Sequence, residues 1–444
     1  MRPTLAILCV FCALPTSVHA ENWPDWRGPN HDGVSHETGL ATKWSDKENV
    51  AWTLKMPGKA GSTPIVWGNQ IFLTSAEGIE PKRTESPKKG RKDGRNDSPP
   101  TDLILVSISA DGKELWRRKL AKAGRGAIRN DEGNEASASP STDGKHVYCF
   151  VSTGDLTCFD FAGNEVWHRD IQKDYGKFSI QHGMHQSPIL YGDRLYVALI
   201  HNNGHWLIAL DKATGKEIWK VKRESDARGE SREAYASPIL WKNGPDTQIV
   251  VLGADYATGH RLEDGKEDWR LGGLNPKGPR YSSALRIIAT PAPSPEGLVV
   301  PTARGGLIVA LRPGVKGDVA AGSPFEFWRK TRGAPDVPTP VVHEGIVYAP
   351  REDGGIIQCW DLKTGAENYV DRIHSDRYRG SPVYGDGKVY LTARDGTFTV
   401  LEAGPKFKVL ATNTLPDHFT SSPAISGGTI YLRGFETLYA IRNR

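Results

Sequence analysis

The stretch SPILYGDRLYVALIHNNGHWLIALDKATGKEIWK, from Ser187 to Lys220, contains one complete unit of a pattern that recurs through most of the chain. A Ser-Pro step precedes an apolar pair, a Gly-Asp turn and an alternating strand. A second turn, another alternating strand, a Thr-Gly turn and a short last strand follow. Proline cannot donate to a sheet and therefore belongs at the start of a strand, whereas glycine supplies the positive φ of tight turns. The stretch predicts a four-stranded antiparallel sheet.

The same pattern opens eight times with a Ser-Pro or Thr-Pro step, at intervals of roughly 40 to 50 residues after a longer first unit. Repeats of four short strands at this period are typical of the blades of a β-propeller. The eight prolines that mark the units are Pro64, Pro140, Pro188, Pro238, Pro291, Pro340, Pro382 and Pro423.

The two ends of the repeat region predict how the ring closes. The eighth unit stops where its fourth strand should begin, whereas Asn49 to Met56, with Trp52, reads as a strand that precedes the first unit. An N-terminal strand in the last blade would remove the sheet edges that promote aggregation. We therefore expect an all-β, eight-bladed propeller of four-stranded antiparallel blades over residues 49–444. Aromatic side chains near the end of most units should fill the wedge between blades: Trp116, Trp167, Trp219, Trp269 and Trp328.

Three segments depart from the repeat. Residues 1–20 read as a secretory signal cleaved near Ala20, which predicts an exported protein of the periplasm or cell surface, soluble after cleavage. Residues 21–48 carry three tryptophans, and a strap against the propeller is favoured over a plug or lid. Residues 79–100 form a basic insertion in blade 1 that cannot bury a core and is expected to be disordered. No later segment is apolar enough to span a membrane.

The net charge of +5 is mild and comes from interspersed charges of both signs, which does not favour nucleic acid as a partner.

Cys149 and Cys158 flank the turn STGD. If Thr153 and Gly154 form that turn, the two cysteines oppose one another and a cross-strand disulfide fits an oxidising compartment. Two unlinked buried thiols fit equally well.

The motif LIALDKATGKEIW, together with the opening NWPDWRGPNHDGVS, resembles the PQQ-like β-propeller family, also called quinoprotein alcohol dehydrogenase-like. That family includes pyrroloquinoline quinone (PQQ) dehydrogenases, exported repeat proteins of planctomycete-type bacteria, and the propeller lipoprotein of the outer-membrane protein assembly machinery. The resemblance to the enzymes implies PQQ with calcium, an adjacent Cys-Cys pair and a set of Glu, Asn and Asp ligands. This chain has no Cys-Cys pair, no matching ligand set and no C-x-x-C-H haem motif. No cofactor is therefore expected, and PQQ with calcium remains an alternative.

The propeller topology predicts where a site would form. The loops before each Ser/Thr-Pro step and the hairpins between second and third strands share one face, which we call the upper face. Arginines that recur in blades five to eight are suited to a carboxylate, phosphate or sulfated ligand, unless they pair with neighbouring acids. The candidate ligand-binding residues of this upper funnel are Glu135, His182, His185, Glu233, Arg304, Asp336, Arg351, Arg379, Arg394 and Arg433.

His182 and His185, with His201 and His205 of the next hairpin, are residue types that bind transition metals, but no carboxylate stands at a fixed spacing and no metal site is predicted. The favoured hypothesis is a monomeric, non-catalytic binding or scaffold protein of the cell envelope. Its expected partner is an envelope protein or an anionic polysaccharide. The alternative is a quinone- or metal-dependent oxidoreductase of the PQQ type, and a third class is a carbohydrate-binding or carbohydrate-modifying propeller.

Overall fold

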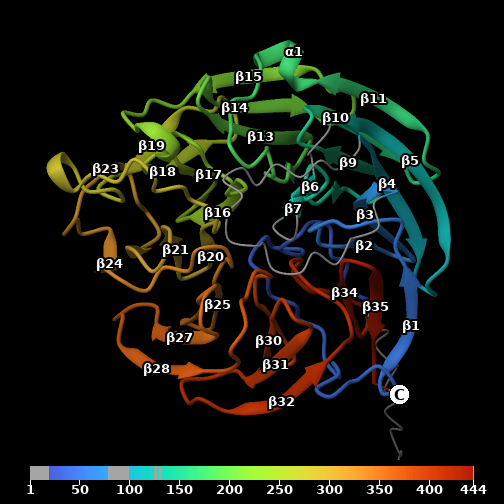
Figure 1. The fold of residues 1–444 in the computed structure, drawn as a ribbon. Helices are drawn as coiled ribbons and strands as arrows, with labels where there is room; N and C mark the ends of the chain where they lie inside the picture. Colours follow the sequence, from blue (N-terminus) through green and yellow to red (C-terminus); the bar gives the residue numbers. More distant parts are fainter. Residues whose placement is uncertain (1–19, 79–99, 125–127, 130–132, 444) are drawn as a thin grey trace, which may run out of the picture.

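The computed structural model describes residues 20–78, 100–124, 128–129 and 133–443. Within these residues eight sheets lie in sequence order around a ring, and blue β1 lies beside red β35 (Figure 1). The prediction of an all-β, eight-bladed propeller of antiparallel blades is confirmed. The signal peptide at 1–20 and the basic insertion at 79–100 lie almost wholly outside the described residues.

Blades 1 to 4 follow the repeat units along the chain. Their strands are β2 (Ile65–Trp67), β3 (Gln70–Glu77), β4 (Thr101–Ser109) and β5 (Glu114–Ala123); β8 (Ser141–Thr142), β9 (His146–Phe150), β10 (Asp155–Asp160) and β11 (Glu165–Asp170); β12 (Ile189–Tyr191), β13 (Arg194–His201), β14 (Gly204–Asp211) and β15 (Glu217–Lys222); and β16 (Ile239–Asn243), β17 (Asp246–Gly253), β18 (Tyr256–Arg261) and β19 (Glu267–Leu271).

Blades 5 to 8 complete the ring. Their strands are β20 (Ala292–Ser294), β21 (Gly297–Pro301), β22 (Ile308–Leu311) and β24 (Glu326–Lys330); β25 (Val341–His343), β26 (Ile346–Pro350), β27 (Ile356–Asp361) and β28 (Glu367–Arg372); β29 (Val383–Gly385), β30 (Lys388–Thr392), β31 (Thr397–Glu402) and β32 (Val409–Thr414); and β33 (Ala424–Ser426), β34 (Thr429–Arg433), β35 (Thr437–Ile441) and β1 (Val50–Lys55).

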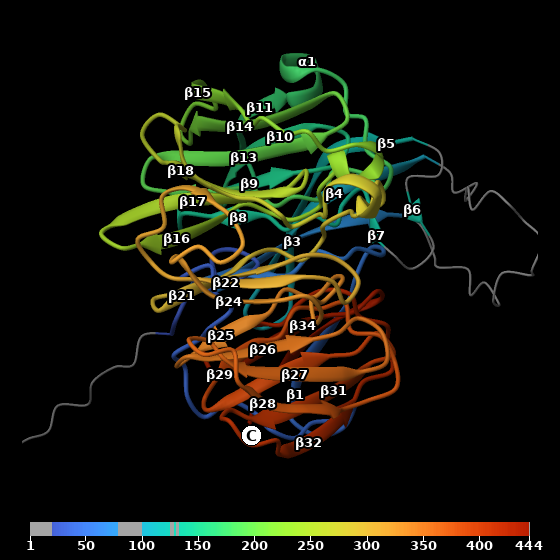
Figure 2. The same cartoon turned by 90° about the vertical axis from the view of Figure 1, so that its left-hand side faces the viewer.

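The remaining elements decorate the ring. Strand β23 (Gly317–Val319) pairs in parallel with β19, so the sheet of blade 4 has a fifth strand. Two short strands, β6 (Ile128–Arg129) and β7 (Gly133–Asn134), lie toward the upper face (Figure 2). Helix α1 (Ile171–Tyr175) follows blade 2, and short 3₁₀ helices span Gly229–Arg232 and Gly278–Arg280.

The ring closes as predicted, because β1 pairs antiparallel with β35 as the outer strand of blade 8. Trp52 on β1 donates from its indole nitrogen to the carbonyl of Ala110 in blade 1, at 2.8 Å. The same indole packs on Gly112, where a Cβ atom would lie 2.5 Å from the ring. The last blade is therefore joined to the first by an N-terminal strand and by a tryptophan that only glycine accommodates.

This tryptophan contact repeats between neighbouring blades and explains the aromatic residues at the ends of the units. The indole of Trp167 in blade 2 donates to the carbonyl of Lys212 in blade 3, at 2.9 Å, and packs on Gly215. The same arrangement holds for the pairs Trp116–Phe161, Trp219–Leu262 and Trp328–Leu362. Trp269 differs, because its indole bonds Gln248 of its own blade at 2.8 Å. The predicted wedge-filling role is thus combined with a hydrogen bond to the next blade.

The cysteine pair is not bonded, and the disulfide alternative is wrong. The strands β9 and β10 pair Cys149 with Thr157, and Cys158 with Tyr148. This one-residue offset places the two thiols on opposite faces of the blade, because successive side chains alternate across a sheet. Cys149 packs in the core between blades 1 and 2, whereas Cys158 packs against blade 3. Both are free and buried, and burial raises the pKa of Cys158 to about 12.

The N-terminal segment both straps and plugs the ring. Residues 37–48 run along blades 7 and 8, where Trp44 is buried and its backbone nitrogen donates to Asn413. Residues 23–34, which we call the plug, cross the channel between bridges to Val66 of blade 1 and Tyr384 of blade 7. The strap favoured from the sequence describes only the second half of the segment.

A buried arginine holds the plug in the channel. The Arg27 guanidinium is fully buried and donates to the carbonyls of Pro382 at 2.8 Å and Pro340 at 3.1 Å. It also donates to the carbonyl of Asp32 within the plug, at 2.9 Å. Burial lowers the pKa of Arg27 to about 10, against the raising effect of Asp32 and Asp25. The plug is therefore tied to two inner strands by charge-assisted hydrogen bonds.

Candidate functional site

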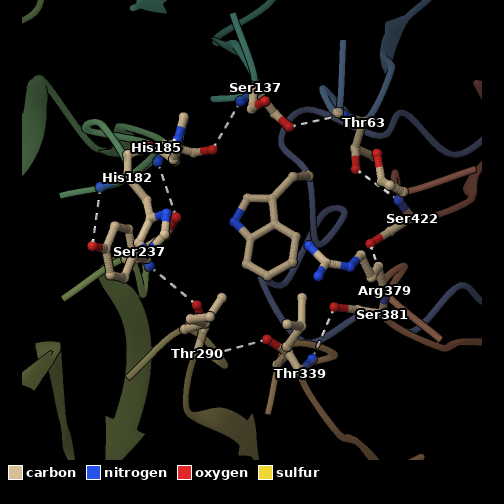
Figure 3. Close-up of a pocket in the computed structure, with 18 of the residues that line it drawn as sticks. Thr63, Ser137, His182, His185, Ser237, Thr290, Thr339, Arg379, Ser381 and Ser422 are labelled. Atoms are coloured by element: carbon tan, nitrogen blue, oxygen red, sulfur yellow. Dashed lines mark hydrogen bonds between the residues drawn. The ribbon is translucent and has the colours of Figure 1, made fainter. Parts of the chain in front are cut away.

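A cavity of about 240 Å³ occupies the axis of the propeller on the upper face (Figure 3). Its wall is made by the loops that precede the Ser/Thr-Pro steps, and Trp26 of the plug also lines it. Asp25 and His31 line a separate cavity of about 750 Å³ at the opposite, lower face. The plug therefore divides the channel, and the upper cavity is blind.

The Ser or Thr of every Ser/Thr-Pro step lines this cavity, and together these eight residues form a closed belt of hydrogen bonds. Each hydroxyl oxygen accepts from the backbone nitrogen of the equivalent residue in the preceding blade, at 2.9 to 3.1 Å. Figure 3 shows part of this circle. In order around the ring, the hydroxyl belt consists of Thr63, Ser139, Ser187, Ser237, Thr290, Thr339, Ser381 and Ser422.

The belt explains why the residue before each proline is Ser or Thr. A residue before proline is held in an extended conformation, and a hydroxyl there satisfies a buried backbone N–H of the neighbouring blade. The hydroxyl residue recurs in the sequence at every repeat, but its hydrogen bond reaches a neighbouring blade and is defined only by the folded ring. Because the last bond runs from Ser422 of blade 8 to Thr63 of blade 1, the belt also closes the ring.

Removal of one belt hydroxyl should lower stability measurably. In Ser381→Ala the buried backbone N–H of Thr339 loses its acceptor, which costs about 1–3 kcal/mol. Ser381→Thr keeps a hydroxyl, as Thr does at three natural belt positions, and should cost much less. Urea unfolding of the two variants checks this, and equal midpoints for Ala and Thr would contradict the role of the belt.

Four of the ten predicted site residues line the cavity, namely Glu135, His182, His185 and Arg379. Glu233 lies beside the cavity without lining it. Glu233 is buried and accepts hydrogen bonds from the Tyr235 hydroxyl at 2.8 Å and from Asn202 at 2.6 Å. Tyr235 in turn lines the cavity, so Glu233 supports the wall rather than facing a ligand.

The predicted arginines do not converge on one ligand. Arg433 is wholly buried and donates to the carbonyl of Gly58 at 2.5 Å, so its assignment as a ligand-binding residue needs correction. Arg304 is exposed at the rim, where its Nε atom lies 3.6 Å from Asp336. Arg351 is exposed and Arg394 half-buried, and neither lines the cavity. The sequence places these side chains at equivalent repeat positions but does not show which of them are buried.

Both arginines that line the cavity lie beside a carboxylate. Arg379 lies 2.9 Å from Glu352, and both side chains are largely buried. Burial raises the pKa of Glu352, while Arg379 opposes that shift. Arg286, which also lines the cavity, lies 3.3 Å from Glu230. Arg286, Glu352, Tyr235 and Trp26 were not among the predicted site residues, because only the folded ring brings their loops together.

The four histidines of blade 3 and of the loop before it occupy two places. His182 and His185 line the cavity, and the Nε2 atom of His185 lies 2.5 Å from the carbonyl oxygen of His182. His201 and His205 are buried in blade 3, where His205 Nε2 bonds the carbonyl of Arg232 at 3.0 Å. Within the described part of the chain, no group of three or more His, Cys, Asp or Glu side chains is arranged to hold a metal ion.

The buried histidines predict loss of stability in acid. Burial lowers the pKa values of His201 and His205 to about 4, below the value near 6.5 of the unfolded chain. The unfolded state therefore takes up protons first, and the free energy of unfolding should fall as the pH falls from about 7 to about 4. Urea unfolding across this range should show a shallower pH dependence for His201→Gln/His205→Gln. A control change at the exposed His36 should leave the slope unaltered, and an unchanged slope in both variants would contradict the prediction.

The fold and the cavity define a closed eight-bladed propeller with a blind cavity at its axis, lined by hydroxyl, charged and apolar side chains. A family model described as "Outer membrane protein assembly factor BamB" matches residues 99–220 and 152–404. These matches span most of the chain, and the protein belongs to the PQQ-like β-propeller family, as the sequence motifs indicated. No curated protein matches the sequence.

Solved structures share the fold at low identity. The quinohemoprotein alcohol dehydrogenase from Comamonas testosteroni is 12% identical with a TM-score of 0.62, covering 95% of this chain and 81% of the other. A europium-containing methanol dehydrogenase is 12% identical with a TM-score of 0.66, and the match covers 95% of this chain and 89% of the other. BamB from Moraxella catarrhalis is 12% identical with a TM-score of 0.57, and the match covers 89% of this chain and 97% of the other. At this identity the similarity shows the fold alone.

The metal of the europium-containing neighbour raises the question of whether this cavity suits a hard cation. Ions such as calcium take six to eight oxygen ligands, usually with several carboxylates. The described carboxylates that line the cavity are Glu135 and Glu352, and Glu352 is already paired with Arg379. The donor set does not fit such an ion, which agrees with the lack of a matching ligand set in the sequence.

Among the described residues, no helix is long and apolar enough to cross a membrane.

Proposed function

We propose that this protein is an exported, non-catalytic binding propeller of the cell envelope that receives a partner in its upper funnel. The observation that carries the proposal is the blind cavity at the centre of the upper face, surrounded by paired charges. The plug closes it from below, and the ion pairs Arg379–Glu352 and Arg304–Asp336 stand at its wall and rim. A concave site with a few fixed polar groups is typical of binding sites.

The family supports a protein partner. The matching family model is named for an outer membrane protein assembly factor, and BamB from Moraxella catarrhalis matches over 97% of its length. The signal-like segment at 1–20 supports export to the periplasm or cell surface. A monomer is also proposed, because β1 gives blade 8 its fourth strand and leaves no unfilled place for a strand from a second copy. An anionic polysaccharide is a less favoured partner, since the arginines at the funnel are paired with acids.

Partner capture tests the funnel directly. The mature protein, immobilised on beads, should retain a partner from envelope extracts, and Arg286→Ala and Arg304→Ala should reduce that retention by tenfold or more. The matched control is Arg261→Ala, because Arg261 is an exposed arginine that pairs with Asp264 outside the funnel. Equal retention by all variants would contradict a role for the upper funnel. The oligomeric state is tested separately by light scattering, which should give the mass of a monomer.

The alternative function is an oxidoreductase that uses a quinone in the same cavity, and the dehydrogenase neighbours are its support. It is tested by the native mass and absorbance spectrum of the mature protein before and after addition of PQQ with calcium. A stoichiometric mass increase with a quinone band would favour the oxidoreductase. No uptake would favour the binding propeller.

A further inference from the structure

The hydroxyl belt has an unused hydrogen-bonding capacity that faces the cavity. All eight side chains are more than nine-tenths buried. Each oxygen accepts one backbone N–H, yet among the described residues no acceptor is found for the eight O–H hydrogens. A buried hydroxyl normally makes such a bond to protein, to water or to a ligand. The belt therefore presents a circle of donors to whatever fills the cavity.

The charge of the cavity favours a neutral occupant. Arg379 is paired with Glu352, and Arg286 with Glu230, so neither guanidinium is uncompensated. A ligand with full negative charge would have to compete with Glu352, which lines the cavity with Glu135. A neutral ligand that carries several oxygens accepts bonds from the belt without that repulsion. Carboxylates at the wall can accept bonds from the hydroxyls of the same ligand.

The size and the apolar part of the wall narrow the ligand further. A volume of about 240 Å³ lies a little below the range of about 300–1,000 Å³ that is typical of small-molecule sites. It therefore suits a small ligand, such as one six-membered polyol ring with its hydroxyls. Trp26, Ile288 and Val337 also line the cavity and provide apolar surface for the C–H groups of that ring.

We infer that the hydroxyl belt and Trp26 bind a neutral cyclic polyol of single-pyranose size, either free or at the end of a glycan chain. The inference rests on the proposed binding function of the funnel and names the ligand class of its central cavity. The belt donates to the oxygens of the polyol, the wall carboxylates accept from its hydroxyls, and the indole contacts the apolar edge of its ring. The Ser/Thr-Pro steps would thus bind the ligand through their hydroxyls, and the WPDWRGP stretch through Trp26, in addition to their roles in the fold.

The test uses the mature protein with glucose, galactose, N-acetylglucosamine and myo-inositol as probes, followed by calorimetry and saturation-transfer NMR. At least one probe should bind with a dissociation constant of about 1 mM or tighter. Glycerol serves as an acyclic control, and equal binding of glycerol would overturn a ring-specific site. A glycan array distinguishes the sources, because binding to terminal residues alone would identify a glycan end and binding of the monosaccharide would identify free sugar.

Variants separate this role from the structural role of the belt. Ser187→Thr/Ser237→Thr/Ser381→Thr keeps every belt hydroxyl but adds three methyl groups around the cavity, and should weaken binding at least tenfold without loss of folding. Trp26→Leu should weaken it similarly. The control Ser45→Thr/Ser109→Thr changes two serines away from the cavity and should bind normally. Unchanged affinity in the triple variant, or no binding of any probe, would overturn the inference. If the mature wild-type protein captures a partner but binds no polyol, only the polyol inference is rejected. If it neither captures a partner nor binds a polyol, the proposed binding function is rejected as well.

Discussion

A chain that begins at residue 57 should fail to form a stable monomer, because it lacks β1 and leaves blade 8 with three strands. Strand β1 pairs with β35 from Val50–Ile441 to Lys55–Thr437, and Val50, Trp52 and Leu54 pack on the core cluster of blade 8. A fully buried side chain of this size contributes about 1.5–3 kcal/mol. Three half-buried ones and the lost ladder bonds should together remove roughly 4 kcal/mol or more. The loss would also expose the β35 edge to pairing with other chains.

The matched control is a chain that begins at residue 49, which keeps β1 but lacks the plug and strap. It should remain monomeric, with a lower melting temperature, whereas the chain from 57 should aggregate or form strand-exchanged oligomers. Size-exclusion chromatography with light scattering and circular dichroism distinguish the two. A peptide of residues 43–56 supplied in trans should partly restore the monomer. A monomeric 57–444 chain with the melting temperature of the 49–444 chain would show that β1 does not close the ring.

The fold could be predicted because each repeat unit contains residues that mark its own strand starts and turns. Proline marks the first strand, paired turn residues mark the hairpins, and the Asp-x-x-Thr-Gly turn accepts the tryptophan of the preceding blade, as Gly215 does for Trp167. Such signals act over a few residues and repeat eight times, so one ambiguous unit does not alter the assignment. Ring closure followed from a missing strand at one end and an extra strand at the other.

Details that depend on one residue of register could not be predicted in the same way. The sequence predicts a two-residue turn within STGD, but five residues, 151–155, separate the paired positions Phe150 and Leu156. An odd loop length moves Cys149 and Cys158 to opposite faces of the blade. Nothing in the local sequence distinguishes the two turn lengths, whereas the packed cores on either side do.

The site was predicted only in part, because burial is a property of the assembled ring. Loop residues before the Ser/Thr-Pro steps converge as the topology requires, which placed Glu135, His182, His185 and Arg379 at the cavity. Trp26 comes from outside the repeat, and no periodic signal points to it. The belt shows the opposite case, because its Ser/Thr signal is strictly periodic but the hydrogen bonds depend on how neighbouring blades pack.

Replacement of Arg433 by alanine should be the most damaging single substitution at the seam between blades 8 and 1. The guanidinium is wholly buried and burial lowers its pKa to about 9, with Asp417 as the opposing charge. It donates to the carbonyl of Gly58, in the segment between β1 and β2, at 2.5 Å and to the Ser75 hydroxyl of blade 1 at 3.4 Å. It also donates to the carbonyl of Phe435 at 3.5 Å. Arg433→Ala should lower the free energy of unfolding by about 3–5 kcal/mol, since it leaves a cavity and unpaired buried acceptors.

Two further variants separate the packing of Arg433 from its hydrogen bonds. Arg433→Met keeps most of the volume and removes the cost of burying a charge, so it should lose only about 1–3 kcal/mol from the unpaired acceptors. Arg304→Ala removes an arginine from the equivalent hairpin position of blade 5, where the side chain is exposed, and should change stability by less than about 0.5 kcal/mol. Urea unfolding midpoints rank the three. Equal losses for Arg433→Ala and Arg304→Ala would mean that the seam does not depend on the buried cation, and that β1 and the hydroxyl belt hold blades 8 and 1 together without it.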